Sequence, residues 1–241
     1  VASINALLGP THRDAYRSGP PLLHYLEVGA KYRPQTHPLF EPSAYAAAFD
    51  RARSLISGPE IDRSPLSVPD LLRHYVEVGA PLGVAGTPYF DAEYYTSQRG
   101  AVRGDPLRTY LLPGGFETFS PHPAVMVGHY VRHARFDPRE IPPLLHLLST
   151  PQEHRVSPHP AFDVEYYRGA HPEIGAGCPI LHFMATGMAG DAAPNSWFSH
   201  EYVLCEDNQR VFGGKSVVRE YLAGALWQRP RLVFVSHDAS L

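Results

Sequence analysis

The sequence predicts an all-α chain built from tandem repeats of short helical hairpins, about 36 residues each, stacked into an array. Two recurring motifs with a common spacing, and a regular placement of proline and glycine around them, predict this architecture. The apolar fraction is 44%, which is enough for a sizeable core, and 11% of the residues are aromatic, which argues against disorder despite the 25 prolines. We therefore interpret the prolines as boundaries of folded segments.

The first motif is Leu-x-x-aromatic-Leu-x-x-Gly, whose apolar positions at i, i+3 and i+4 lie on one face of a helix. Its aromatic position recurs at intervals of 50, 35, 37, 36 and 38 residues and is occupied by Tyr25, Tyr75, Tyr110, Leu147, Phe183 and Tyr221. The second motif, Phe-Asp-x-x-x-Tyr, lies between copies of the first, and its last position is occupied by Tyr45, Tyr95, Tyr130, Tyr167 and Val203. Because both motifs share the long first interval, we expect residues 51–68 to form an inserted surface loop.

Proline and glycine delimit the helix of the first motif in most copies. Prolines precede it, where a first-turn proline is tolerated, at Pro21, Pro106, Pro143 and Pro179. Glycines follow it, where we expect a left-handed cap, at Gly29, Gly79, Gly114 and Gly187. The helix of the second motif has N-cap candidates at Asp91, Asp163 and Ser199, each preceded by an extended link. One hairpin buries too little to offset its ordering entropy, so we expect neighbouring copies to stabilise each other.

Two segments resemble a bacterial repeat of the type PLLHYLxxGAxxGRxPxPxFDxxYY. They are Pro21–Ala30 (PLLHYLEVGA) and Pro88–Tyr95 (PYFDAEYY), and the resemblance covers roughly residues 10–228. Such repeats occur beside glycosyltransferase domains of surface-polysaccharide synthesis, and also in large secreted calcium-binding and surface proteins. The resemblance therefore implies an interaction or scaffolding arm of a glycosyltransferase, with a glycan-binding or surface-attachment module as the alternative.

The last residues change in character. Within Arg231–Leu241, the run Leu232–Val235 is continuously apolar, as in a buried parallel strand. The stretch resembles the first strand and following loop of GT-B glycosyltransferases that use nucleotide-sugar donors. This resemblance implies a helical repeat domain at 1–228 and the start of a truncated GT-B domain at 229–241. It places His237 and Asp238 in a substrate-facing loop, whereas a stray strand or tail is the alternative.

Composition excludes several kinds of partner. The net charge is −3 with interspersed signs, which provides no electrostatic footprint for nucleic acid. No apolar run approaches the ~18 residues that span a bilayer, so we expect no transmembrane segment, while peripheral membrane association stays open. Cys178 and Cys205 form no CxxC motif, which indicates a reducing compartment. We expect a cytoplasmic chain whose partner is a protein or a polysaccharide acceptor.

The 14 histidines invite a metal hypothesis, in its strongest form a zinc-dependent enzyme. His129 and His133 have a chelating i, i+4 spacing, but no His-Glu-x-x-His motif accompanies them, and we expect no metal site. A structural role, with the imidazole bonded to a backbone carbonyl, is expected at one recurring position: His24, His74, His146 and His182. A turn-forming role is expected in the links between helices, at His37, Thr87, His122, His159 and Asn195.

The remaining candidates also favour structural roles. In the pairs Tyr94-Tyr95 and Tyr166-Tyr167 we expect one ring in the core, because adjacent helix positions diverge, and the other available to stack on sugars. Trp197 and Trp227 are ambiguous in the same way. Gly213–Ser216 (GGKS) lacks the upstream glycine of a phosphate loop and is interpreted as a turn and helix cap. The repeats show no catalytic set of residues.

Overall fold

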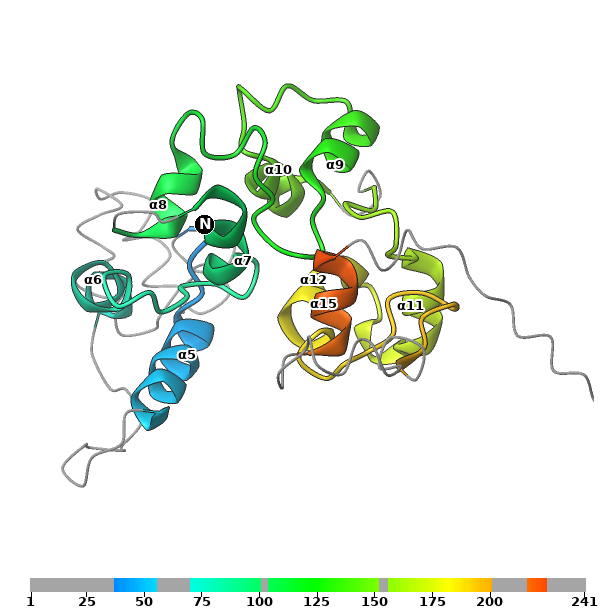
Figure 1. Ribbon diagram of the computed structural model, residues 1–241. Coiled ribbons are helices and arrows are strands. Elements are labelled where there is room, and N and C mark those ends of the chain that lie inside the picture. The colour runs from blue at the N-terminus through cyan, green and yellow to red at the C-terminus, as the bar shows by residue number, and fades with distance from the viewer. Residues whose placement is uncertain (1–36, 56–69, 101–103, 152–155, 201–215, 225–241) are drawn as a thin grey trace, which may run out of the picture. The chain divides into compact units, whose positions relative to one another are not determined.

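A computed structural model describes residues 37–55, 70–100, 104–151, 156–200 and 216–224 (Figure 1). Within these ranges the regular elements are helices, and no strand is present, which confirms the predicted mostly-α class. They are α5 (Pro42–Leu55), α6 (Leu71–His74), η2 (Tyr75–Gly79), α7 (Ala92–Arg99), α8 (Pro106–Leu111), α9 (Val127–Ala134), α10 (Pro143–Ser149), α11 (Val164–Ala170), η4 (Pro172–Ile174), α12 (Pro179–His182), η5 (Phe183–Gly187) and α15 (Val217–Ala223). The C-terminal strand predicted at residues 232–235 lies outside the described residues.

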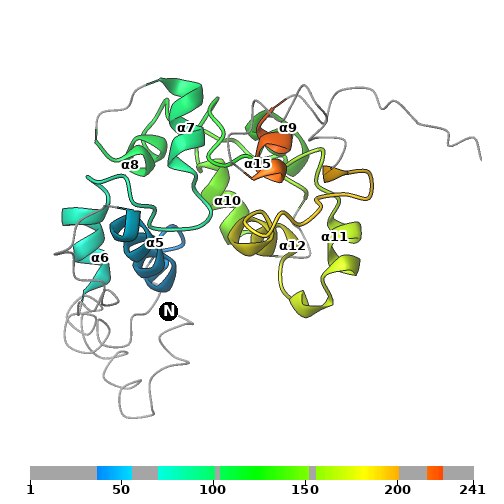
Figure 2. The same ribbon diagram turned by 60° about the horizontal axis from the view of Figure 1, so that its bottom comes forward.

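The chain divides into two compact units, Val1–Pro160 and Ala161–Leu241. In the first unit, α5 packs against α6, α7 against α8, and α9 against α10; in the second unit, α11 packs against α12. Figure 2 shows α5 beside α6 and α7 beside α8. In each case a second-motif helix contacts the first-motif helix that follows it along the chain.

The helices begin as the local sequence predicts. The carboxylate of Asp91 accepts the backbone N–H of Tyr94 at 2.8 Å, and that of Asp163 accepts the N–H of Tyr166 at 2.9 Å. These bonds satisfy N–H groups that have no partner within the helix. First-turn prolines are found at the predicted places, Pro106, Pro143 and Pro179.

The predicted role of the glycines is correct for one described position and wrong for two. Gly114 has a φ of 79°, the left-handed conformation expected of a cap. Gly79 and Gly187 instead lie inside the π-helical turns η2 and η5, with negative φ. They are required for space, because a Cβ atom on Gly79 would lie 2.5 Å from Cε2 of Tyr45. Gly187 is crowded in the same way by the ring of Tyr167.

The predicted inserted loop begins later than expected. Residues 51–55 belong to α5, which continues to Leu55. Within this part of the helix Arg53 pairs with Asp50 at 2.5 Å, and its guanidinium lies over the ring of Phe49 at 5.6 Å from the centroid. These i, i+3 and i, i+4 contacts extend the helix past the second motif. Residues 56–69 lie outside the described part of the chain.

Candidate functional site

Aromatic and polar side chains gather where a second-motif helix meets the next first-motif helix. We call each of these places a joint and number the four in chain order. The first, second and third joints lie in the first unit, at α5/α6, α7/α8 and α9/α10, and the fourth lies in the second unit, at α11/α12. Their central residues are Phe40, Tyr45 and Tyr75; Phe90, Tyr95 and Tyr110; Val125, Tyr130 and Leu147; and Phe162, Tyr167 and Phe183. All twelve are buried.

Three joints contain the same cluster of three rings. The tyrosine that ends each second motif contacts, edge-on, the aromatic ring of the first motif that follows it along the chain. The ring centroids are 5.3 Å apart for Tyr45–Tyr75, 5.7 Å for Tyr95–Tyr110 and 5.3 Å for Tyr167–Phe183. The interplanar angles are 79°, 88° and 85°. Edge-to-face pairs of this kind are favoured by the ring quadrupoles. In the third joint Val125 replaces the phenylalanine of the second motif, and Leu147 replaces the aromatic residue of the first motif. Both side chains are buried, so the same positions are buried in this joint as in the other three.

Each joint also buries a tyrosine hydroxyl against a specific acceptor. In three of the four, the tyrosine Oη lies within hydrogen-bond distance of a histidine Nδ1: Tyr45–His74 at 2.6 Å, Tyr130–His146 at 2.8 Å and Tyr167–His182 at 3.0 Å. The prediction that these histidines bond a backbone carbonyl is wrong, because the partner is the tyrosine of the preceding motif. His24 lies outside the described residues.

The second joint differs because a threonine replaces the histidine. Thr109 occupies the histidine position, and Tyr95 donates its hydroxyl proton to the carbonyl oxygen of Gly115 at 3.0 Å. Arg99 reinforces this joint, since its guanidinium donates to the carbonyl of Gly114 at 2.9 Å. Gly115 leaves no room for a Cβ atom, which would lie 2.8 Å from the carbonyl oxygen of Tyr110.

Burial shifts the pKa of three side chains in the tyrosine–histidine pairs. Burial raises the pKa of Tyr45 and of Tyr167 to about 12, with a smaller contribution from the charge of Glu173 at Tyr167. Burial also lowers the pKa of His146. A tyrosine that keeps its proton can donate its hydroxyl to Nδ1 of the tautomer protonated on Nε2, or accept from Nδ1 of the other tautomer.

A backbone hydrogen bond accompanies every joint. The N–H group at the start of a second-motif helix donates to a carbonyl in the next link, always at 2.9 Å, in four cases: Glu41 to Gly86, Asp91 to Pro121, Met126 to Pro158 and Asp163 to Pro194. The acceptor always directly precedes the polar link residue, Thr87, His122, His159 or Asn195. Corresponding backbone groups are thus joined in these four cases, which satisfies a donor that the helix leaves unpaired.

The link residues form the turns predicted from the sequence. A side-chain acceptor takes the N–H group two residues later in four cases: His37 from Leu39 at 3.1 Å, Thr87 from Tyr89 at 3.3 Å, His122 from Ala124 at 3.1 Å and Asn195 from Trp197 at 3.1 Å. At the remaining link, the carbonyl of His159 accepts the hydroxyl of Ser157 at 2.8 Å. Thr87, His122, His159 and Asn195 are all buried, so these polar groups hold the links in place.

Replacing Asn195 with alanine is expected to lower the free energy of unfolding by about 2 kcal/mol. The amide donates to the carbonyl of Ala161 at 2.6 Å from a fully buried position, and the substitution leaves that carbonyl and the N–H of Trp197 without this partner. Urea denaturation followed by circular dichroism measures the loss. Ser196→Ala, at the adjacent exposed residue, is the control, and equal losses in the two variants would contradict the assignment.

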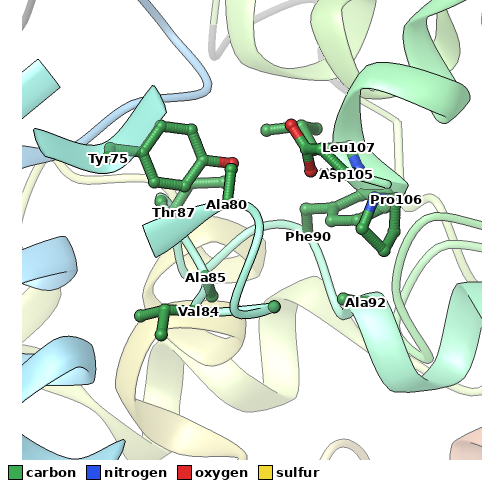
Figure 3. A pocket seen from close by; sticks show the side chains of 12 residues that line it. Tyr75, Ala80, Val84, Ala85, Thr87, Phe90, Ala92, Asp105, Pro106 and Leu107 are labelled. Atoms are coloured by element: carbon green, nitrogen blue, oxygen red, sulfur yellow. Dashed lines mark hydrogen bonds between the residues drawn. The ribbon is translucent and has the colours of Figure 1, made fainter. Parts of the chain in front are cut away.

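A small open hollow in the first unit is lined by Tyr75, the segment 83–87, Phe90 and the start of α8. Figure 3 shows Tyr75 and Asp105 on opposite sides of it. The space within it measures only about 10 Å³, which is room for about one water molecule and far below the 300–1,000 Å³ typical of small-molecule sites. The carboxylate of Asp105 accepts the N–H of Leu107 at 3.0 Å, and the hydroxyl of Thr87 holds its link. The side chains of Asp105 and Thr87 therefore already serve the fold.

The other candidates also have structural partners. The rings of His129 and His133 lie 4.0 Å apart, and Nδ1 of His133 lies 2.8 Å from the carbonyl oxygen of His129 in the preceding turn. Among the described residues, no group of three or more His, Cys, Asp or Glu side chains is placed to hold a metal ion. Ser216 caps α15 by accepting the N–H of Arg219 at 3.2 Å, as predicted, while Gly213–Lys215 lie outside the described residues.

The tyrosine pairs behave as predicted. Tyr95 and Tyr167 are fully buried, and Tyr94 and Tyr166 are partly exposed. Trp197 is 45% exposed, whereas Trp227 lies outside the described residues. His237 and Asp238, the two proposed substrate-binding residues, also lie outside them.

Sequence reasoning missed one pairing that closes the second joint. Gln98 and Ser120 bond reciprocally, since the Gln98 amide donates to the Ser120 carbonyl at 2.9 Å and accepts the Ser120 N–H at 3.0 Å. No motif contains these residues, so the sequence carried no signal for them. The tyrosine–histidine pairs did have a signal, because both positions recur with one period.

None of the described helices is both long and apolar enough to cross a bilayer. Comparison with protein-family models, with curated proteins and with solved structures found no match to this chain.

Proposed function

We propose that this chain is a non-catalytic array of stacked helical hairpins, and that it serves as an interaction or scaffolding arm of a glycosyltransferase of surface-polysaccharide synthesis. The observation that carries the proposal is the recurring joint. The rings, the buried tyrosine hydroxyl and the backbone hydrogen bond repeat at corresponding positions of the copies. Proteins in which each copy contacts its neighbours offer extended surfaces for partners.

The placement of polar groups supports a scaffold in preference to an enzyme. At the joints the histidines and tyrosines bond to each other, and in the links the polar side chains bond to backbone. A catalytic site needs such groups to converge on a space that a substrate can enter. Their use within the joints leaves the outer faces of the helices for a protein partner or a polysaccharide acceptor, in the cytoplasm.

The glycosyltransferase part of the proposal is supported by the resemblance of the repeats and of residues 231–241. The parent enzyme would transfer a sugar from a nucleotide-sugar donor, and His237 and Asp238 would lie near its substrate. The arm itself would need no cofactor, because its proposed task is to position the catalytic domain, a partner enzyme or the acceptor chain.

Deletion of one period tests the array. Removing residues 76–110 takes out 35 residues and joins Tyr75 to Leu111, so each motif keeps its neighbour. We expect a helical, cooperatively unfolding protein by circular dichroism. Removing residues 76–93, half a period, leaves two incompatible half-copies in contact and should abolish cooperative unfolding. Equal disruption by both deletions would contradict the array.

The coding sequence beyond the codon for Leu241 tests the glycosyltransferase assignment separately. We expect a glycine-containing turn, a helix and then alternating strands and helices over roughly 300 residues, the size of a large α/β domain. A stop codon at this point would remove the assignment and leave the array unaffected.

One observation favours the second candidate, a glycan-binding module. Trp197 is 45% exposed, and its backbone N–H is held by the buried side chain of Asn195. A tryptophan with one exposed face can stack on a sugar ring. Titrating the whole chain with capsular polysaccharide, with and without Ca²⁺, should produce saturable fluorescence quenching that Trp197→Ala abolishes and Trp227→Phe does not. The absence of quenching in the unmodified chain would rule out this candidate.

A further inference from the structure

Two histidine rings lie side by side on α9, in the first unit. The ring centroids of His129 and His133 are 4.0 Å apart, and the ring planes are inclined to each other by 30°. We propose that these two imidazoles chelate one zinc ion at the surface of the helix. The missing His-Glu-x-x-His motif deprives the pair of a general base for catalysis, but it does not prevent chelation by two rings at this spacing. The inference is independent of the proposed function.

Hydrogen bonds to the backbone determine which nitrogen of each ring is available to a metal. Nδ1 of His133 lies 2.8 Å from the carbonyl oxygen of His129. A carbonyl only accepts, so Nδ1 carries the proton and Nε2 of the neutral ring has a free lone pair. A backbone hydrogen bond with Ser157 favours the charged form of His129, so this ring also donates one N–H to a carbonyl. Histidine ligands of metals are oriented in this way, because the second nitrogen is held by a carbonyl or a carboxylate.

Both rings are accessible from solvent, and the surroundings of His129 favour the form that binds a metal. His133 is exposed and His129 is partly exposed. Burial, and then repulsion from His133 and Arg132, lower the pKa of His129 from its ordinary value of 6.5. A metal ion binds only the deprotonated nitrogen of an imidazole. At pH 7.5 the ring of His129 therefore presents a lone pair and does not have to lose a proton first.

The chemistry of the donors selects the class of ion. Imidazole nitrogen suits zinc, copper and nickel, whereas magnesium and calcium require oxygen ligands. In the described part of the chain no third His, Cys, Asp or Glu side chain joins the pair. Two rings therefore hold the ion, and water occupies the remaining positions of its coordination sphere. We expect binding to be weaker than at a closed structural site, which has four protein ligands.

The ion would stabilise a helix that lacks the cap of its counterparts. In α7 and α11 the carboxylates of Asp91 and Asp163 accept a backbone N–H of the first turn. The corresponding residue of α9 is Met126, whose side chain makes no capping hydrogen bond. His129 and His133 lie in successive turns of α9, so an ion bound to both holds these turns together. Because the unfolded chain does not keep the two rings together, zinc should stabilise the folded state.

Calorimetric titration of the intact chain with zinc at pH 7.5 tests the proposal, with protein purified without a histidine tag. We expect the tightest site to hold one ion per chain. Loss of a partner behind a ligand already weakens metal binding about 10–100-fold, so His129→Ala and His133→Ala should each weaken it at least about tenfold. His200→Ala, at an exposed histidine outside α9, is the control and should leave the affinity unchanged. An affinity that survives both α9 substitutions, or that falls equally in the control, would overturn the proposal.

Two further measurements locate the ion without removing a ligand or by its effect on folding. Arg132→Gln removes a positive charge that acts on His129, so zinc should bind about threefold more tightly. Arg73→Gln, at an arginine paired with Glu77 on another helix, should leave the affinity close to that of the unmodified chain. Zinc should raise the urea midpoint of the unmodified chain and not that of His133→Ala. Weaker binding in Arg132→Gln, or an equal rise of the midpoint in His133→Ala, would refute the proposal.

Discussion

Gly187→Ala is expected to destabilise the second unit by about 3 kcal/mol, the upper part of the range for overpacked interiors. A Cβ atom there would lie 3.1 Å from Cζ of Tyr167 and closer still to its hydroxyl oxygen. The ring cannot move aside, because its hydroxyl is bonded to His182 at 3.0 Å and its edge contacts Phe183 at 5.3 Å between centroids. The methyl group therefore disrupts the ring contact, the hydrogen bond or both.

A glycine in the facing helix provides the matched control. Gly169 lies in α11, and a Cβ atom on it would meet nothing within 4 Å. Because alanine favours a helix over glycine, Gly169→Ala should be neutral or stabilising by up to about 1 kcal/mol. Urea denaturation of both variants, followed by circular dichroism, measures the difference. If Gly187→Ala were as stable as Gly169→Ala, the close approach of Tyr167 to η5 would be incorrect. Gly79→Ala should repeat the result in the first unit, against Gly128→Ala.

Phe183→Ala should destabilise the second unit by about 4 kcal/mol, as for other large aromatic residues truncated in a core. The ring is fully buried and contacts both Tyr167 and Phe162, whose centroids lie 5.3 Å and 5.0 Å away. Removing it leaves a cavity between α11 and η5 and exposes the tyrosine–histidine hydrogen bond to water. The loss of stability should therefore be larger than the transfer free energy of the ring alone.

The third joint indicates which residue can replace Phe183 in the fourth joint. Leu147 occupies the place of Phe183 there and is fully buried. Phe183→Leu should therefore cost only about 1–2 kcal/mol, because it preserves most of the buried apolar surface and leaves a smaller cavity. Trp197→Ala, at an exposed ring, should change stability little. Equal losses for the Ala and Leu variants at position 183 would contradict the equivalence of the two joints.

Features of the fold that depend on neighbouring residues could be predicted from the sequence. The N-caps at Asp91 and Asp163 and the turns at Thr87, His122 and Asn195 were all identified correctly. Each involves atoms two or three residues apart, so local chemistry alone determines the geometry. The burial of Tyr95 and Tyr167 followed from the periodicity of the helix.

The sequence did not predict which residues from different helices contact each other. The histidines were expected to have a structural role, but their partners are tyrosines 15 to 29 residues earlier in the chain. The sequence predicts left-handed caps at Gly79 and Gly187, because a glycine after a helix usually has that role. Their φ values are negative, and what excludes a side chain is a ring from the preceding helix.

Local sequence thus specifies the helices, their first turns and the periodic placement of apolar residues, because each depends on interactions within one or two helical turns. Tertiary structure decides which hydroxyl meets which imidazole and why a glycine stands at the end of two first-motif helices. These features arise only when segments separated by 15 to 34 residues pack together. Close packing leaves no space for even one methyl group at such a contact, and this constraint is not visible in the residues on either side of it.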